Sequence, residues 1–253
     1  MSPPAPAPLA VAVHGAGGRM GGVLCRLIAA ATDLRLVAAW GRSGDDRLGR
    51  DVGTIHGLGP LGVPLERLGV RGTRPAVVVD FSLPAAWPAL AEFCREERLP
   101  LVSGTTGGED PERTLGRAAE VVPVLWAPNF SPALAALAEV LPTLAGLLPE
   151  EVALGVLDVH HAHKRDAPSG TALRLAQLAG SGTRPVATAS LRLGEVVGEH
   201  VLYFEGADER LEIRHRVHDR SVFARGALLA ARRLVARGPG WYRLADVLRD
   251  PPP

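Results

Sequence analysis

The feature that most constrains the fold is a glycine-rich turn that lies between an apolar segment and a helix-like segment near the start of the chain. Residues 9–13 are apolar on both faces, GAGGRMGG occupies 15–22, a helix pattern covers 20–31, and residues 34–40 are again strand-like. A strand, glycine turn, helix and strand within about thirty residues are typical of a parallel sheet whose first turn binds phosphate. The chain is therefore predicted to begin as an α/β fold with a phosphate-binding turn.

The alternation of strands and helices continues to about residue 129. Strand patterns lie at 76–80, 99–103 and 123–126, with helix patterns between them at 85–98 and 111–121. Residues 41–74 are rich in glycine and lack periodicity, so we expect loops with one short strand there. This order predicts a doubly wound, Rossmann-type parallel sheet over residues 9–129.

The pattern changes after residue 129. Helices are expected at 132–148 and 171–179, and strands at 152–159, 187–193, 200–204 and 211–215, the last with alternating apolar and charged residues. Such alternation suits a mixed or antiparallel sheet with one solvated face. We therefore predict a second, α+β domain at 130–219. C-terminal helices at 222–236 and 241–248, within residues 220–253, would return to the first domain, and residues 1–8 would form a disordered leader.

The composition excludes several classes of protein. The 253 residues carry a net charge of +1 without like-charge blocks, which argues against binding to nucleic acid or to membrane surfaces. Cys25 and Cys94 lie far apart in apolar helical contexts, so we expect neither a disulfide nor a metal site, and a reducing compartment fits. There is no apolar run long enough to span a membrane and no signal-peptide pattern, so a cytoplasmic location is expected.

Several loops follow predicted strands and should meet at the carboxyl edge of the first sheet, where ligands bind in such folds. The glycine turn would let the backbone approach a pyrophosphate, and free amides at the start of the helix would bind it. After the second strand, the acid that would hold the 2′-hydroxyl of NAD is absent; Arg42 and Ser43 could hold the 2′-phosphate of NADP, or Arg42 is only a surface residue. GTTGG at 104–108 and APNFS at 127–131 would bring small residues and the Asn129 amide to a nicotinamide.

A second group of polar residues contains Lys164, the only lysine of the chain, although 28 residues are lysine or arginine. It ends HHAHK at 160–164, and SGT at 169–171 would begin a helix. An ammonium can release a proton whereas a guanidinium cannot, and hydroxyls and free amides at a helix N-terminus bind carboxylates. The segment predicts an anion-binding, proton-donating site for a small dicarboxylate. The alternatives are a structural polar loop and a metal site, although no Cys or paired carboxylate with ligand spacing accompanies the histidines.

The motifs GAGGRMG, DFS, SGTTG, APNFS, HHAHKRDAPSGTA, VVGEH and ERLEIRH, in this order, resemble those of the dihydrodipicolinate reductase family. The resemblance spans nearly the whole chain. It implies an enzyme of diaminopimelate and lysine biosynthesis that reduces 4-hydroxy-tetrahydrodipicolinate or dihydrodipicolinate to tetrahydrodipicolinate with NADPH or NADH.

The resemblance also implies roles for individual residues. His160 would be the general acid/base and Lys164 the proton donor, with the substrate carboxylates held by His161, Ser169, Gly170 and Thr171. The pyrophosphate would be held by Gly15, Ala16, Gly17, Gly18, Arg19 and Met20. The nicotinamide would be lined by Gly104, Thr105, Thr106, Ala127, Pro128, Asn129 and Phe130. No metal is implied.

Two departures from the family pattern leave alternatives open. Gly41 stands where the family often carries an acid, which leaves the choice between NADPH and NADH open. The segment before VVGEH is shorter than in well-known members, so the expected homo-oligomer, built through the sheet domain, could be a tetramer or a dimer. Leu191, Leu193, Leu202 and Phe204 would need cover from a helix or from another subunit.

Two other functions share a nucleotide-binding first domain. One is another nicotinamide-dependent imine or amino-acid dehydrogenase of the same architecture, and the other is a non-catalytic NAD(P)H-binding sensor. Neither gives a reason for HHAHK beside SGT, so the reductase is the preferred interpretation.

Overall fold

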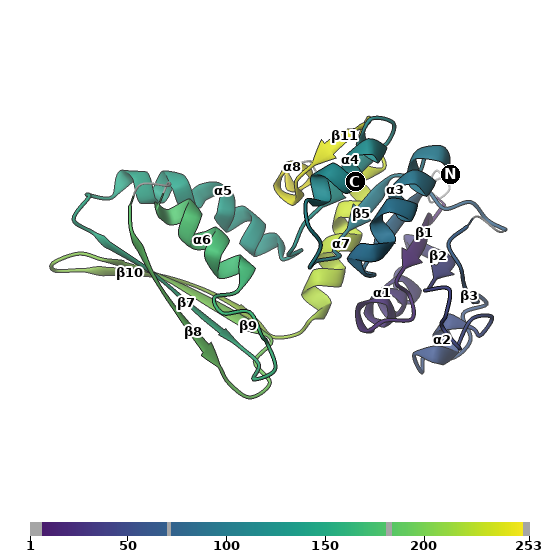
Figure 1. Cartoon of the computed structure of the whole chain (residues 1–253), viewed down its shortest axis with the longest axis horizontal. Coiled ribbons are helices and arrows are strands. Elements are labelled where there is room, and N and C mark those ends of the chain that lie inside the picture. Colours follow the sequence, from purple (N-terminus) through teal and green to yellow (C-terminus); the bar gives the residue numbers. More distant parts are fainter. Residues whose placement is uncertain (1–6, 70–71, 181–183, 250–253) are drawn as a thin grey trace, which may run out of the picture. The chain divides into compact units, whose positions relative to one another are not determined.

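The computed structural model describes residues 7–69, 72–180 and 184–249, which form two compact units (Figure 1). One unit comprises the chain up to Phe130 together with the chain from Phe223 onward, and the other is Ser131–Val222. The leader expected at 1–8 lies outside the described residues except for Ala7 and Pro8. The chain therefore leaves the first unit once and returns to it.

Among the described residues, the first unit contains a seven-stranded parallel sheet. Its strands are β1 (Leu9–His14), β2 (Leu34–Trp40), β3 (Leu65–Glu66), β4 (Val77–Asp80), β5 (Leu101–Ser103), β6 (Pro123–Trp126) and β11 (Gly240–Tyr242). They are ordered β11-β6-β5-β4-β1-β2-β3, and all neighbours are parallel. The order reverses between β1 and β4, which is where the carboxyl ends of such strands open a ligand-binding crevice. The predicted doubly wound, Rossmann-type fold is confirmed.

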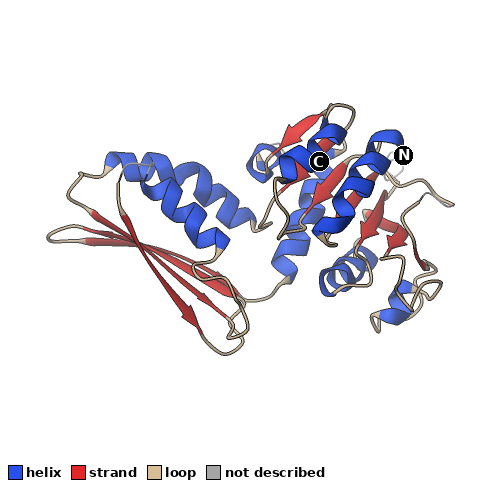
Figure 2. Cartoon of the chain, viewed as in Figure 1, coloured by secondary structure: helices blue, strands red, loops and turns tan. Residues whose placement is uncertain are grey.

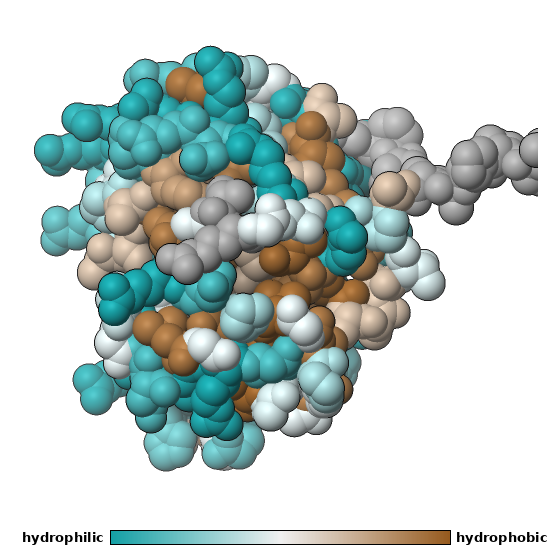
Figure 3. Space-filling view, turned by 90° about the vertical axis from the view of Figure 1, so that its right-hand side faces the viewer, coloured by the Kyte–Doolittle hydropathy of each residue, from teal (hydrophilic) through white to brown (hydrophobic). Residues whose placement is uncertain are grey.

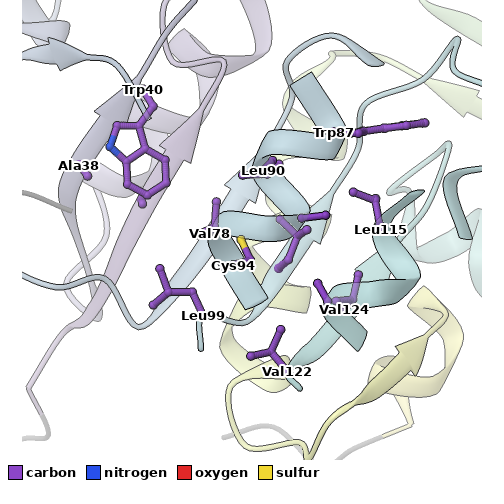
Figure 4. Packing of buried hydrophobic residues seen from close by; sticks show 14 residues of the cluster. Ala38, Trp40, Val78, Trp87, Leu90, Cys94, Leu99, Leu115, Val122 and Val124 are labelled. Carbon is purple, nitrogen blue, oxygen red and sulfur yellow. The ribbon is translucent and has the colours of Figure 1, made fainter. Parts of the chain in front are cut away.

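A hydrophobic core of this unit lies between the sheet and two neighbouring helices, α3 (Trp87–Glu96) and α4 (Pro111–Ala119). Figure 4 shows its side chains, which include Trp40, Trp87 and Leu90. Each of these three side chains is at most 2% exposed, and burying a large apolar side chain contributes about 1.5–3 kcal/mol. Cys25 and Cys94 are buried free thiols, and burial raises the pKa of Cys25 to about 12, so neither has the character of a reactive thiolate.

Two small-residue helices also pack within this unit. Helix α1 (Arg19–Ala29) follows the glycine turn, and α7 (Ser221–Leu234) buries alanines along most of its length. A Cβ on Gly226 would lie only 1.8 Å from the carbonyl oxygen of Phe130, so this glycine lets α7 lie directly against the end of the APNF segment. A larger residue there would push the helix away from the backbone.

Two local expectations were wrong. Residues 241–248 were expected to be helical throughout, but Gly240–Tyr242 forms β11 beside β6, and only Leu244–Leu248 is helical (α8). Aromatic residues favour strands, and the edge of β6 offers unpaired hydrogen-bonding groups. The segment 41–74 contains not only a short strand, β3, but also the four-residue helix α2 (Val52–Ile55), which Asp51 caps by accepting from the Thr54 amide at 3.0 Å. So short a helix shows no periodicity in sequence.

The second unit is a four-stranded mixed sheet with two helices on one face (Figure 2). The strands are β7 (Ala153–His160), β8 (Val186–Arg192), β9 (Gly198–Glu205) and β10 (Arg210–Val217), and the helices are α5 (Pro132–Leu147) and α6 (Gly170–Gly180). Their order is β10-β9-β7-β8, with β8 parallel to β7 and the other pairs antiparallel. The mixed sheet of the second domain is thereby confirmed.

The helices of this unit cover two of the four apolar residues that were expected to need cover. Leu202 and Phe204 are buried in the core beneath α5 and α6. Leu191 and Leu193 stay 52% and 62% exposed. The sequence could not tell which of the four faced the helices, because that depends on the register of each strand.

The surface carries both hydrophobic and hydrophilic residues. On the face shown in Figure 3, hydrophobic residues lie between hydrophilic regions. Within the part of the chain that the structure describes, no helix combines the length and the apolar character needed to cross a membrane.

Candidate active site

The glycine turn is shaped by close contacts that exclude side chains. Gly15 has a φ of +78°, and a Cβ there would lie 2.4 Å from the carbonyl oxygen of Phe81. A Cβ on Gly21 would lie 2.3 Å from the carbonyl oxygen of Gly15. Gly21, one position later than the usual third glycine of such turns, therefore packs the helix against the turn. The irregular spacing of GAGGRMGG does not prevent the tight geometry.

A cleft of about 560 Å³ opens beside this turn, within the range of about 300–1,000 Å³ that is typical of ligand sites. The predicted cofactor residues that line it are Gly15, Gly17, Gly18 and Arg42, and Ser43 lies beside them. These residues come from the carboxyl ends of β1 and β2, so the cleft lies at the switch point of the sheet. The dimensions and the glycine lining suit the phosphates and ribose of a dinucleotide.

A second arginine, which the sequence did not single out, also lines the cleft. The Arg47 guanidinium donates to both carboxylate oxygens of Asp45, at 2.8 and 2.6 Å, and to the Gly17 carbonyl at 3.1 Å. The hydrogen bonds from Arg47 hold the pKa of Asp45 well below its usual range. The cation is thus fixed over the glycine turn, and because the pair lies in a loop without a motif, no sequence pattern revealed it.

Behind the cleft, Asp80 connects the ends of three strands. Its fully buried carboxylate accepts from His14 Nδ1 at 2.9 Å, Ser103 Oγ at 2.6 Å and Thr105 Oγ1 at 2.9 Å. Burial alone would raise the pKa of Asp80, but the hydrogen bond and charge of His14, with the hydroxyl and amide donors, lower it overall. The carboxylate therefore stays ionised and holds the first residues of GTTGG in place. The Thr105 side chain is committed to this network, whereas Thr106 is exposed.

Phe81 links the cleft to the two loops expected near the nicotinamide. It lines the cleft, and a Cβ on Gly104 would lie 2.4 Å from its ring. The Phe81 and Phe130 ring centroids are 5.8 Å apart. GTTGG and APNF therefore both adjoin the residues that line the cleft.

The remaining predicted cofactor residues do not line the cleft. Ala16 is buried, and its carbonyl accepts from His56 Nε2 at 2.7 Å, so it offers only backbone. Arg19 and Met20 form the first turn of α1. Ala127 is buried after β6, Pro128 is exposed and Asn129 is half-buried.

In the second unit, His160 lies at the end of β7 and is oriented by Asp158. Its Nδ1 is 2.9 Å from Asp158 Oδ2, and this carboxylate is fully buried. A Cβ on Gly198 would lie 3.1 Å from His160 Nε2, so this glycine of VVGEH gives the ring its space. Burial lowers the pKa of His160, and the positive charge of Lys164 adds to this, while the hydrogen bond to Asp158 opposes it. The imidazole therefore keeps Nδ1 occupied and Nε2 open to exchange a proton.

The strand register places Ser190, Asp158, His200 and His215 opposite one another across all four strands; these residues are called the polar rung below. The His200 ring lies edge-on to His160 at 5.3 Å and stacks on His215 at 6.1 Å. Burial lowers the pKa of His200 to about 4, so it is neutral at pH 7. The sequence contained both histidines in strand-like runs, but not the register that brings them together.

Each of these histidines contacts the serine that caps a helix. His200 Nε2 is 3.3 Å from Ser169 Oγ, which accepts from the Ala172 amide of α6 at 3.2 Å. His215 Nε2 is 3.0 Å from Ser131 Oγ, which caps α5. The Ser169 hydroxyl, expected at the substrate, is therefore occupied within the protein. Gly170, which is exposed, and Thr171, which is half-buried, begin α6.

Lys164 lies in the loop between His160 and α6. Its Nζ donates to Asp166 Oδ1 at 2.8 Å, and its amide donates to the His161 carbonyl at 3.1 Å. His161 and His163 lie with ring centroids 6.3 Å apart, and His163 is exposed. Among the residues described, there is no group of three His, Cys, Asp or Glu side chains that could hold a metal ion. The loop thus brings an imidazole, an ammonium and a helix N-terminus together, which are the groups that bind a carboxylate and move a proton.

The sequence of each unit matches one half of a known family. Residues 9–130 match the model described as dihydrodipicolinate reductase, N-terminus, and residues 133–248 match dihydrodipicolinate reductase, C-terminus. The 4-hydroxy-tetrahydrodipicolinate reductase of Xanthomonas campestris pv. campestris (strain B100) is 44% identical over 246 residues, which cover 95% of this chain and 98% of that relative. The enzyme of the same name from Stenotrophomonas maltophilia (strain R551-3) is 42% identical over 251 residues, covering 96% and 98%.

Solved structures share the fold. The dipicolinate-bound dihydrodipicolinate reductase from Paenisporosarcina sp. TG-14 superposes with a TM-score of 0.75 at 21% identity, covering 93% of this chain and 97% of that one. An amine dehydrogenase from Mycobacterium smegmatis gives a TM-score of 0.62 at 12% identity, covering 96% of each chain, so the architecture alone does not separate these activities. The matches to both family models and to relatives above 40% identity separate them. They show that the chain belongs to the dihydrodipicolinate reductase family of oxidoreductases.

Proposed function

We propose that this chain reduces 4-hydroxy-tetrahydrodipicolinate, or dihydrodipicolinate, to tetrahydrodipicolinate with NADPH or NADH, in diaminopimelate and lysine biosynthesis. The observation that carries the proposal is the combination of His160, held by Asp158, with Lys164 and the N-terminus of α6 in one loop. The two relatives described above, both 4-hydroxy-tetrahydrodipicolinate reductases, support it.

Each group of the loop has a task in this reaction. The amides of Gly170 and Thr171 at the N-terminus of α6, with His161, would bind the substrate carboxylates. Neutralising these charges draws electron density from the ring and orients it, and both effects favour acceptance of a hydride. The open Nε2 of His160 and the Lys164 ammonium would supply the proton to the reduced substrate.

The cofactor would bind in the cleft of the first unit. When bound, the reduced nicotinamide supplies the hydride. The Gly17 amide would hold the pyrophosphate just before α1, since the Gly18 amide already donates to the Gly15 carbonyl at 2.9 Å. With Gly41 in place of an acid and Arg42 lining the same cleft, we propose that NADPH is used at least as well as NADH.

The test is a steady-state assay of NADPH and NADH oxidation with freshly generated substrate. We expect turnover with the cyclic dicarboxylate and none with imines that lack a second carboxylate. Oxidation of NADPH with simple imines or amino-acid precursors instead would indicate another dehydrogenase of this architecture. Tight NADPH binding without turnover of any substrate would indicate a sensor.

We also propose that the chain forms a homo-oligomer, a tetramer or a dimer, through the sheet of the second unit. Helices α5 and α6 lie on one face only, and Leu191, on the other face, is 52% exposed. A sheet face with exposed apolar side chains is typical of a subunit contact. Light scattering at micromolar concentration should give a multiple of 26.6 kDa, and a mass near that value would contradict the proposal.

We also propose a cytoplasmic location, because both cysteines are buried free thiols, which fits a reducing compartment.

A further inference from the structure

Asp158 occupies an unusual place in the second unit, because one buried carboxylate contacts both ends of the loop that carries the candidate catalytic groups. It accepts from His160 Nδ1 at 2.9 Å and from the Ser169 amide at 3.4 Å. It also accepts from Ser190 Oγ at 2.5 Å and from Arg192 Nη1 at 3.1 Å. The loop from His160 to Ser169 is thus closed at its base by a single side chain with no exposed surface.

Arg192, on the neighbouring strand, extends this arrangement to the middle of the loop. While Nη1 holds Asp158, Nη2 donates to the carbonyl oxygen of Asp166. The Asp166 carboxylate in turn accepts from Lys164 Nζ at 2.8 Å. His160 and Arg192 are paired in the register of β7 and β8, so the cation approaches the loop from the adjacent strand. One guanidinium therefore restrains the backbone that positions Lys164.

Asp158 is the anionic group that contacts His160 directly, through the hydrogen bond at Nδ1. Lys164 from the loop and Arg192 from β8 are cations, and His200 from β9 and His215 from β10 are imidazoles. An ionised carboxylate at Nδ1 requires that nitrogen to carry the hydrogen. The proton that His160 exchanges must then be at Nε2, beside Gly198.

We propose that Asp158 and Arg192 are positioning residues of the reductase: Asp158 sets the tautomer and orientation of His160, and Arg192 fixes the loop that presents Lys164 and the N-terminus of α6. The inference rests on the proposed function for its kinetic consequences, but not for the tautomer. A buried ion pair is weak support for stability alone, since apolar residues of similar size often serve as well. Here each partner also hydrogen-bonds to the loop or its ends, Asp158 to His160 and Ser169 and Arg192 to the Asp166 carbonyl, which a purely structural pair would not need to do.

The first experiment replaces the carboxylate by Asp158→Asn and follows His160 by NMR of protein with 15N-labelled histidine, its signal assigned with His160→Gln. In the unaltered protein we expect the Nδ1–H tautomer. In Asp158→Asn we expect mixed tautomers and a lower pKa of His160, because the anionic partner is lost. The matching limb of the pH–rate profile should move to lower pH by the same amount, and kcat should fall by about 10²–10⁴-fold.

The second experiment separates Arg192 from Asp158 with Arg192→Lys. An ammonium keeps the charge but cannot donate in a planar fork to both Asp158 and the Asp166 carbonyl. We expect His160 to retain its Nδ1–H tautomer while kcat falls and KM for the dicarboxylate rises. Ser190→Ala, which removes one donor from Asp158 at a smaller cost, should change both readouts in the direction of Asp158→Asn and keeps the test available if that variant does not fold.

A matched control is Asp33→Asn, which removes the carboxylate that accepts from Arg232 at 2.6 and 3.0 Å in the first unit, outside the cleft lining. It should leave kcat and the His160 signal unchanged. The proposal is overturned if Asp158→Asn, or Ser190→Ala in its place, leaves the tautomer and pKa of His160 as they were. If the tautomer changes as expected but no variant or parent turns over the dicarboxylate, the proposed function fails and the positioning role of Asp158 stands.

Discussion

The cofactor cleft and the site formed by His160 and the polar rung, called the histidine site below, are built in opposite ways. Glycines make up much of the cleft lining, and a Cβ on Gly15 or Gly18 would meet another backbone atom. The histidine site is made of side chains from four strands in one register, each with a defined partner. The first site should tolerate no added atoms, and the second should tolerate no change of functional group. The two are therefore expected to fail in different ways when altered.

The largest effect is expected from Lys164→Arg. The change keeps the positive charge that attracts a dicarboxylate but replaces a compact donor that can lose its proton by a planar group that cannot. We expect kcat to fall by about 10²–10⁴-fold, the usual contribution of general acid catalysis. NADPH fluorescence titration should show unchanged cofactor binding.

Two companion variants sharpen this result. His160→Gln should cause a loss of similar size, and the two losses should not add, because residues that act together fail together. His163→Gln should be much milder, since His163 is exposed. Near-normal kcat in Lys164→Arg would mean that Lys164 contributes only its charge.

Gly15→Ala, by contrast, should lower stability and weaken cofactor binding. An alanine there would adopt a φ of +78° with its Cβ 2.4 Å from the Phe81 carbonyl, which cannot move freely. We expect the free energy of unfolding to fall by about 2–4 kcal/mol and NADPH binding to weaken at least about tenfold. Urea unfolding and fluorescence titration measure the two effects. Gly44→Ala, where no atom lies within 4 Å of the new Cβ, is the control and should change neither.

A smaller effect is expected where the cleft does depend on a side chain. Removing the guanidinium in Arg42→Ala should reduce the preference for NADPH over NADH by about 1.5–3 kcal/mol, the range for a hydrogen bond to a charged group. The ratio of kcat/KM for the two cofactors gives the answer. Arg50→Ala, an exposed arginine outside the cleft lining, should leave the ratio unchanged. An equal lack of effect in both variants would make Arg42 a surface residue.

The smallest effect concerns the pH dependence of stability. The pKa of His200 falls from 6.5 to about 4 on folding, so between these values the unfolded chain binds the proton more strongly. Acidification through this window therefore favours unfolding, and stability at pH 7.5 should exceed that at pH 5 by on the order of 1–2 kcal/mol from this residue. Urea unfolding of His200→Gln at both pH values should show a reduced difference. An undiminished difference would mean that the pKa of His200 does not fall on folding and that this residue does not contribute to the pH dependence of stability.

The same contrast explains what the sequence could predict. The strand, glycine turn and helix are neighbours in the chain, so their spacing was enough to indicate the phosphate-binding turn and the Rossmann-type sheet. The polar rung joins Ser190, Asp158, His200 and His215 from four strands, and no local pattern contains their register. Asp158 and Arg192 were missed for that reason. For the same reason the sequence could not tell that helices cover Leu202 while Leu191 stays exposed, because the face on which a strand residue lies follows from pairing.

The return of the chain to the first unit has a consequence for how the protein is made. Strand β11 pairs with β6, and α7 places Gly226 against Phe130, yet both follow the whole second unit in sequence. While the chain emerges from the ribosome, Ser131–Val222 is complete before the first sheet has its last strand. Until then β6 presents an unpaired edge, the kind of surface that chaperones cover and that aggregates when left bare. The order of synthesis therefore leaves the cofactor-binding unit, which begins first, to be finished last.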